Sequence, residues 1–224
     1  MSDTVEAVEA VVFDLDGVLV DSEVWWDDIR RDWAAEHGRR WTEADRAAVM
    51  GANGRQWSTT MARRLELDLP PAEIEGAIVG RVVARYRSEG PPRIDGAVDA
   101  VERAAREVPV AVASSAHRDV IDAALDGLGI ADRFGAIVSS DEVEHGKPAP
   151  DVYLETARRL GVDPRGVVVV EDSLNGVRAA KAAGMRVVLV PNASIPPAPG
   201  AAELADVVLP SLAGFDPSVA ALGA

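Results

Sequence analysis

The sequence of 224 residues contains no cysteine. Disulfide bonds and thiolate chemistry, whether the thiolate acts as a nucleophile or as a metal ligand, are therefore excluded. The chain also lacks an apolar run approaching the roughly 20 residues that cross a bilayer. Its acidic first residues do not have the basic and apolar regions of a secretory signal. We expect a cytoplasmic protein without a membrane partner.

Basic residues are scarce, and lysine is rare among them. The formal net charge is -14, and Lys147 and Lys181 are the only two lysines in the sequence. Because binding to nucleic acid requires a basic face, we expect no nucleic acid partner. An anionic substrate must therefore be small and locally neutralised. The compact ammonium group of Lys147 is suited to contact both a phosphate oxygen and a carboxylate.

Two carboxylates separated by one residue follow the first apolar run. Residues 12–22 read Val-Phe-Asp-Leu-Asp-Gly-Val-Leu-Val-Asp-Ser, which places Asp14, Asp16 and Gly17 at the end of a predicted strand. Residues i and i+2 of a strand lie on the same face, so both carboxylates can point into one volume beyond its carboxyl end. The spacing indicates either a metal or acid–base site or an ordinary solvated turn, and by itself it does not separate the two.

Three further polar segments occur where apolar runs end. They are Val-Ala-Val-Ala-Ser-Ser (110–115), His-Gly-Lys-Pro-Ala-Pro-Asp (145–151) and Val-Val-Val-Val-Glu-Asp-Ser (167–173). Together with the Asp-Leu-Asp-Gly segment, and in this order, they resemble the four signature segments of the haloacid dehalogenase-like hydrolase superfamily. The resemblance extends over essentially the whole chain and favours a functional site over a turn.

The order of expected elements predicts an α/β fold. We expect strands near 9–14, 109–114, 136–139, 166–171, 186–190 and 206–209, and helices near 96–107, 117–128, 149–160 and 173–183. Because strands and helices alternate from residue 94 onward, they predict a Rossmann-like, mostly parallel sheet with helices on both faces. Ligand sites of such sheets lie at the carboxyl ends of the strands, where the signature segments fall.

Residues 22–89 carry no strand pattern and are expected to be entirely helical. Apolar residues recur at i, i+3 and i+4 in four stretches, namely 23–37, 42–50, 55–65 and 71–88. We predict that residues 21–90 form a helical cap domain, inserted into a core domain of residues 1–20 and 91–224, as in many members of the superfamily. A cap that closes over the sheet edge would exclude water and select the substrate.

The resemblance implies phosphoryl transfer and gives the two aspartates separate roles. Asp14 would be the nucleophile, since a carboxylate can form an aspartyl-phosphate and divide one difficult displacement into two easier ones. Asp16 would protonate the departing ester oxygen and later deprotonate the attacking water. Relatives that dehalogenate or transport ions generally lack an aspartate at this second position, so Asp16 favours a phosphatase or a phosphomutase.

The resemblance also implies a Mg²⁺ cofactor. Asp14, Asp172 and the backbone carbonyl of Asp16 would hold the ion, and Glu171 would ligate it directly or through water. Mg²⁺ prefers hard oxygen ligands, which an all-carboxylate site without histidine or thiolate provides. The alternative for residues 171–173 is capping of the following helix, because Asp and Ser are favoured N-cap residues.

Three further segments would clamp the phosphate. Ser114, or in the neighbouring register Ser115, would donate to a phosphoryl oxygen, although a hydroxyl pair at a strand end can instead cap the next helix. Lys147 would contact both the phosphate and the Asp14 carboxylate. The turn at Gly17 would add backbone N–H donors.

Substrate selection is expected to come from residues 50–57 of the insert. Asn53, Arg55 and Trp57 offer polar, cationic and stacking contacts there, or else form an interhelical turn with Trp57 in the core of the insert. In the β-phosphoglucomutase branch a histidine usually occupies the position of Trp26, which argues against a mutase. Arg55 is compatible with one, because a cap arginine of that branch holds a second phosphate.

These observations lead to one predicted function and two alternatives. We predict a Mg²⁺-dependent phosphatase acting on a small phosphorylated metabolite, such as a sugar phosphate or phosphoglycolate. The alternatives are a β-phosphoglucomutase-type phosphomutase and a non-catalytic binding protein on the same fold. The sequence does not indicate an oligomeric state, and a monomer is compatible with it.

Overall fold

The computed structural model describes residues 7–50 and 52–218. The predicted termini of the core domain, residues 1–6 and 219–224, and residue 51 of the predicted specificity segment lie outside the described residues. The strands are β1 (Ala10–Phe13), β2 (Val110–Ser114), β3 (Phe134–Ser139), β4 (Val167–Glu171), β5 (Arg186–Leu189) and β6 (Val207–Val208). The α-helices are α1 (Glu23–Glu36), α2 (Glu43–Val49), α3 (Gly54–Arg64), α4 (Pro71–Glu89), α5 (Ala97–Ala105), α6 (Arg118–Leu128), α7 (Asp151–Leu160), α8 (Leu174–Ala182) and α9 (Ala201–Leu204).

The described strands form one parallel sheet of six strands in the order β3-β2-β1-β4-β5-β6. The central strands β1, β2 and β4 are buried at every position. Their nearly continuous apolar sequence is typical of strands that are covered on both faces. The predicted Rossmann-like α/β fold is confirmed.

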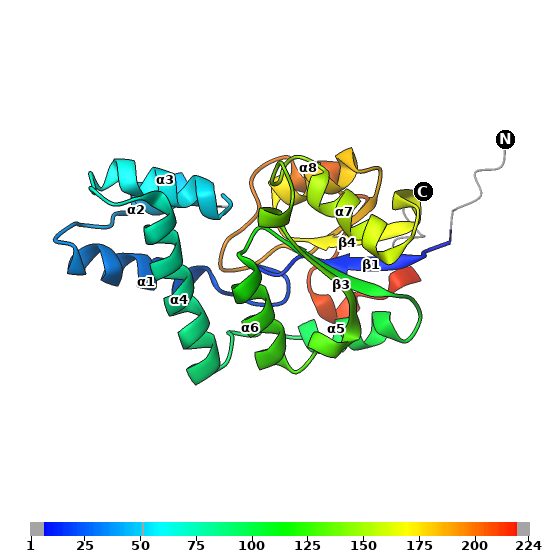
Figure 1. Ribbon diagram of the computed structural model, residues 1–224. Coiled ribbons are helices and arrows are strands. Elements are labelled where there is room, and N and C mark those ends of the chain that lie inside the picture. The colour runs from blue at the N-terminus through cyan, green and yellow to red at the C-terminus, as the bar shows by residue number, and fades with distance from the viewer. Residues whose placement is uncertain (1–6, 51, 219–224) are drawn as a thin grey trace.

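Two separate groups of buried side chains cover the two faces of the sheet. Val11 and Phe13 pack in one group, and Ala10 and Val12 pack in the other, as the alternation of side chains along a strand requires. Helices α5 and α6 cover the first face, whereas α7 and α8 cover the second (Figure 1). Both layers leave the carboxyl ends of β1, β2 and β4 side by side at one edge.

The insert between β1 and α5 consists of the four predicted helices, α1 to α4. Thr42 and Asn53 each form a reciprocal capping box at the start of α2 and α3, and Pro71 occupies the first position of α4. The chain leaves and returns along neighbouring paths, because the Asp21 N–H donates to the Pro92 carbonyl (2.7 Å) and the Ile94 N–H donates to the Leu19 carbonyl (3.1 Å). These paths coincide with the predicted domain borders, although the division into cap and core stays a prediction.

The apolar residues of the insert are continuous with those of the sheet. Trp26, Trp33, Trp41 and Trp57 are buried in the same group as Val11 and Phe13. Helix α4 runs beside α6 and connects the insert to this layer (Figure 1). Within the described residues, no helix combines the length and the apolar character needed to cross a membrane.

Candidate active site

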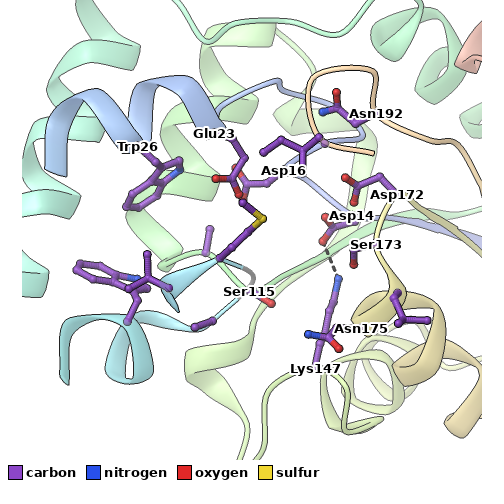
Figure 2. Close-up of a pocket in the computed structure, with 18 of the residues that line it drawn as sticks. Asp14, Asp16, Glu23, Trp26, Ser115, Lys147, Asp172, Ser173, Asn175 and Asn192 are labelled. Atoms are coloured by element: carbon purple, nitrogen blue, oxygen red, sulfur yellow. Dashed lines mark hydrogen bonds and ion pairs between the residues drawn. The ribbon is translucent and has the colours of Figure 1, made fainter. Parts of the chain in front are cut away.

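The edge formed by β1, β2 and β4 brings together residues from the four signature segments. Asp14 follows β1 and is 7% exposed, and its N–H donates to the Val170 carbonyl of β4 (3.0 Å). Ser114 ends β2, Glu171 ends β4, and Lys147 reaches the same place from the loop before α7. Figure 2 shows Asp14, Asp172 and Lys147 converging on one side of a cavity. The parallel pairing of β1 with β4 therefore brings Asp14 close to Asp172, which is 158 positions away in sequence, and the loop before α7 adds Lys147.

A tight turn positions Asp16 and Gly17 after β1. The Gly17 N–H donates to the Val20 carbonyl (2.8 Å), and the Asp16 carboxylate accepts a hydrogen bond from the Ser22 hydroxyl at the entry to α1. Gly17 has φ +85°, a conformation that side chains other than hydrogen disfavour, and a Cβ at this position would overlap the Asp172 carboxylate. Glycine therefore lets the turn and the acidic group approach each other.

Lys147 links two buried carboxylates. Its Nζ donates to Asp14 Oδ1 (2.7 Å), to Glu171 Oε1 (2.7 Å) and to the Ala113 carbonyl (3.1 Å), and its side chain is only 4% exposed. The Tyr153 hydroxyl donates to the same Glu171 oxygen (2.8 Å), and the Tyr153 ring lies 4.8 Å from Nζ. This arrangement fixes the ammonium group against Asp14. Lys181, in contrast, is a surface residue paired with Asp206.

Glu171 is fully buried and organises the start of α8. Its Oε2 accepts the N–H groups of Asp172 and Ser173 and the Ser173 hydroxyl, each at 3.0 Å. The Ser173 hydroxyl in turn accepts the Gly176 N–H, so the helix cap considered for this segment is present. Gly176 packs directly against the Glu171 carboxylate, where a Cβ would overlap both of its oxygens.

Replacing Gly176 with Ala is expected to destabilise the protein by about 1–3 kcal/mol, because the added methyl group must displace the buried Glu171 carboxylate from its partners. The matched control is Gly80→Ala, since Gly80 is an exposed glycine inside α4 with open space around it. That change should instead stabilise the protein by roughly 0.5–1 kcal/mol through helix propensity. Urea unfolding of both variants measures the difference, and equal effects would contradict the packing argument.

Burial and mutual repulsion shift the pKa values of the carboxyl groups in the site. Burial raises the pKa of Asp14 to about 7 although Lys147 opposes the shift. Burial, together with the negative charges of Glu171 and Asp14, raises the pKa of Asp172 well above its usual range. Burial also raises the pKa of Glu171, but the charge and hydrogen bond of Lys147 outweigh it, so the net shift is downward. If all three acids beside Lys147 were ionised, they would carry more negative charge than one ammonium group compensates, and this repulsion adds to the rise in the pKa of Asp14 and Asp172 that burial causes.

The carboxylates of Asp14, Glu171 and Asp172 have oxygens that all lie within 4.8 Å of one another. Hard oxygen donors at this spacing, which need more positive charge than Lys147 supplies once they are all ionised, fit a Mg²⁺ ion. Glu171 already accepts hydrogen bonds at both of its oxygens, whereas no described residue donates to the side chain of Asp172. The residues present therefore fit the implied metal, with Asp14 and Asp172 offering the freest oxygens.

The two serines at the end of β2 take different positions. Ser114 is fully buried, and its Oγ accepts the Ala116 N–H (3.0 Å). Ser115 is partly exposed and lines the cavity, beside His117. Of the two hydroxyls considered, Ser115, the alternative to Ser114, is thus the one in the cavity wall. A shift of one position at a strand end reverses the side to which a side chain points.

The cavity has a volume of about 380 Å³ and extends from the sheet edge to the insert. Of the three predicted specificity residues, Trp57 lines it. Asn53 caps α3 through its side chain, and both Asn53 and exposed Arg55 line a neighbouring hollow between α3, α4 and the loop around Lys147. The segment therefore combines the two alternatives: it forms the start of a helix, and it also contributes Trp57 to the cavity wall.

Several other residues line the cavity although no motif in the sequence marks them as functional. Glu23 and Arg30 line the cavity from α1 of the insert, and Asn192, Ile195 and Pro196 line it from the loop after β5. Asp21 holds this loop, because its carboxylate accepts Asn192 Nδ2 (3.1 Å) and the Ser194 hydroxyl (2.6 Å). Trp26 and Arg30 are four residues apart in a predicted helix, so their common face could have been read from the sequence.

Comparisons with known proteins agree with this geometry. A family model described as haloacid dehalogenase-like hydrolase matches residues 8–184. The chain is 34% identical to the bifunctional riboflavin kinase/FMN phosphatase of Arabidopsis thaliana over 90% of its own length and 53% of that protein, so it spans about half of this relative. It is 33% identical to hexitol phosphatase B of Escherichia coli, with 93% and 95% of the two chains covered. The crystal structure of a CbbY mutant from Rhodobacter sphaeroides in complex with xylulose 1,5-bisphosphate superposes on this chain with a TM-score of 0.80 at 30% identity. The superposition covers 92% of this chain and 96% of CbbY.

Proposed function

The chain belongs to the haloacid dehalogenase-like hydrolases, and from this we propose that it is a Mg²⁺-dependent phosphatase of a small phosphorylated sugar or related metabolite. The observation that carries the proposal is the buried Asp14 carboxylate, held at 2.7 Å by Lys147 and facing a cavity that Asp16 also lines. The relatives named as phosphatases support the same reaction class. The net charge of -14 supports a small substrate rather than nucleic acid.

Asp14 and Asp16 divide the chemistry between them. Asp14 attacks phosphorus, the bond from phosphorus to the ester oxygen breaks, and Asp16 gives its proton to the departing oxygen. Water then attacks the aspartyl-phosphate while Asp16 takes up one of its protons, which releases phosphate and restores Asp14. Burial raises the pKa of Asp16 despite opposing interactions with Ser22, Lys147 and Arg30, which suits a group that must carry a proton.

Other residues orient the phosphate and balance its charge. Lys147 faces the atom that attacks, so its charge stabilises negative charge moving between Asp14 and the phosphoryl oxygens. Ser115, backbone N–H groups near Gly17 and, after a rotamer change, Ser114 are the neutral donors. Asp14 and Asp172, with the Asp16 carbonyl and Glu171 as further candidates, would hold Mg²⁺. When bound, the ion supplies positive charge that offsets repulsion between Asp14 and the incoming phosphate.

The insert, residues 21–90, is proposed to act as a cap that selects the substrate. Its contribution to the cavity is largely apolar and includes Trp26, Val49 and Trp57. Indole rings suit the carbon face of a sugar, and a covered cavity excludes water that would compete with the proton transfers. Hexitol phosphatase B, by its name, acts on a phosphorylated sugar alcohol, and we extend that substrate class to this chain.

Phosphate release from a panel of sugar phosphates, phosphoglycolate and nucleotides tests the proposal. We expect release with Mg²⁺ and its loss in EDTA, restored when Mg²⁺ is added back, because the clustered carboxylates need a counter-cation. Following a hexose 1-phosphate by NMR separates the alternatives. Free sugar and phosphate would support the phosphatase, the 6-phosphate would support a mutase, and no conversion of any substrate by folded protein would contradict both.

A further inference from the structure

A proline-rich loop after β5 forms a second wall of the cavity. Residues 191–200, which connect β5 to α9, include four prolines. Four consecutive residues of this loop, Ile-Pro-Pro-Ala (195–198), line the cavity. Figure 2 shows Asn192, at the start of the loop, on the side of the cavity away from Trp26. Part of the substrate space is therefore bounded by a segment that does not belong to the insert.

The carboxylate of Asp21 holds this loop in place. Its Oδ1 accepts a hydrogen bond from Asn192 Nδ2 (3.1 Å), and its Oδ2 accepts one from the Ser194 hydroxyl (2.6 Å). The Asn192 Oδ1 atom in turn accepts the Ser194 N–H (2.8 Å). Asp21 lies where the chain leaves the core for the insert, and its own N–H donates to the Pro92 carbonyl (2.7 Å). The loop is thus fixed to the point at which the two connections of the insert meet.

The loop presents hydrocarbon rather than polar side chains to the cavity. The polar atoms of Asn192 and Ser194 are engaged in the contacts with Asp21 and with each other. Residues 195–198 carry only aliphatic side chains, and the two prolines among them have no N–H to donate. This wall therefore suits C–H groups of a ligand, because a hydroxyl group pressed against it would lose water without gaining a partner.

Ile195 is a large aliphatic side chain that packs in neither apolar group of the protein. It is half-buried, yet it belongs neither to the two groups of buried side chains nor to the apolar residues packed against them. Trp26 and Trp57, which also line the cavity, are part of the group that includes Phe13 of β1. Since Pro196 follows Ile195, the backbone of Ile195 is restricted to extended conformations. Its side chain is therefore held in place and available to a ligand.

We propose that Ile195 is a specificity-determining residue that packs against a hydrocarbon flank of the leaving group, and that Asp21 is the positioning residue that holds it there. The inference rests on the proposed function. It narrows the substrate class to phosphate monoesters whose leaving group turns C–H groups, rather than hydroxyl or charged groups, toward this loop. Each methylene group buried in such a contact raises affinity by up to about fourfold.

A series of n-alkylphosphonates, from methyl to hexyl, tests the inference by titration calorimetry in the presence of Mg²⁺. Phosphonates lack the bond from phosphorus to an ester oxygen, so binding is measured without turnover. In the wild-type protein we expect affinity to rise roughly two- to fourfold per methylene. Ile195→Val should reduce the gain between the methyl and hexyl compounds by about threefold. Ile195→Thr has the shape of that variant but carries a hydroxyl group, so it should reduce the gain by about tenfold or more.

Variants of Asp21 test the positioning role. Asp21→Ala removes both hydrogen bonds to the loop and should reduce the gain as Ile195→Thr does. Asp21→Asn should retain part of the gain, because the amide oxygen can still accept the Asn192 Nδ2 hydrogen bond. Combining Asp21→Ala with Ile195→Thr should cost little more than either change alone, since both act on one contact. In turnover of alkyl phosphates the loss should appear in KM, with kcat within about threefold of wild type.

The matched control is Val208→Thr, because Val208 is a 46% exposed aliphatic residue on the edge strand β6 rather than in the cavity wall. It should leave the chain-length dependence intact, and circular dichroism verifies that each variant folds. A flat series in the wild type, or a gain that persists in Ile195→Thr, would overturn the inference. Additive losses in the double variant would remove Asp21 from the positioning role. If no phosphate ester were turned over but the chain-length dependence still followed Ile195, the phosphatase would be contradicted and the contact supported.

Discussion

Asp14→Asn is expected to lower kcat on the best substrate by at least about 10⁴-fold, because it removes the proposed nucleophile, on which both half-reactions would depend. The amide is nearly isosteric with the carboxylate, so the fold should persist. Stability in EDTA should also lose part of its pH dependence. Burial raises the pKa of Asp14 from 3.8 to about 7, so its ionisation costs stability as pH rises through that range, and asparagine does not ionise.

Initial-rate measurements on purified protein, with melting curves between pH 4 and 8, check both parts of this prediction. Asp132→Asn is the matched control, because it removes one negative charge from a side chain that is 75% exposed. It should leave kcat unchanged. A residual rate within tenfold of wild type in Asp14→Asn would remove Asp14 from the role of nucleophile. An unchanged melting profile would mean that folding does not raise the pKa of Asp14, so that the charge of its carboxylate is well compensated in the folded protein.

The candidate catalytic edge was predictable because it depends on local rules. The i, i+2 spacing of Asp14 and Asp16 places two acids at one strand end, and parallel pairing puts that end beside Ser114 and Glu171. Lysine is so rare in this chain that Lys147 also stood out from composition alone. The positions of the helices in the insert followed from apolar periodicity and from start signals such as Thr42.

The rest depends on packing between elements that are distant in sequence. Arg30 on α1 contacts Trp57 on α3, and the apolar periodicity of the two helices contains no information on how they pack against each other. Likewise, the sequence does not decide which of the two hydroxyls at the end of β2 faces the cavity. Only the turn after Ser114 decides this. No sequence motif marks Tyr153 as part of the site, because its hydrogen bond to Glu171 depends on how α7 lies across the sheet.

Lys147→Met is expected to affect stability and turnover together. The change leaves the buried carboxylates of Asp14 and Glu171 without the cation that bonds both at 2.7 Å. Breaking such a pair by removing one partner costs about 3–5 kcal/mol of unfolding free energy. Loss of the positive charge beside the transferred phosphate should lower kcat by about 10²- to 10³-fold. Chemical denaturation in EDTA and initial rates with Mg²⁺ measure the two effects separately.

The destabilisation should depend on pH with a defined sign. In the wild type, Lys147 lowers the pKa of Glu171 below 4.5, so the pair contributes stability above that pH and loses it as pH falls through the folded-state pKa. In Lys147→Met, burial acts without that compensation and raises the pKa of Glu171 above 4.5. Ionisation then costs stability as pH rises. The difference in unfolding free energy between the two proteins should therefore be larger near about pH 8 than near about pH 5.

Lys181→Met provides the matched comparison, because Lys181 is the only other lysine and its side chain is 37% exposed in an ion pair with Asp206. Exposed pairs contribute about 0–1 kcal/mol, so this variant should unfold and turn over almost as the wild type does. If the two lysine variants lost similar stability, with no dependence on pH, Lys147 would not be the counter-charge of the buried acids. If stability fell as expected but kcat did not, Lys147 would hold the site together without stabilising the phosphate. The contacts to the phosphate would then have to come from Mg²⁺ and from the backbone N–H groups around Gly17.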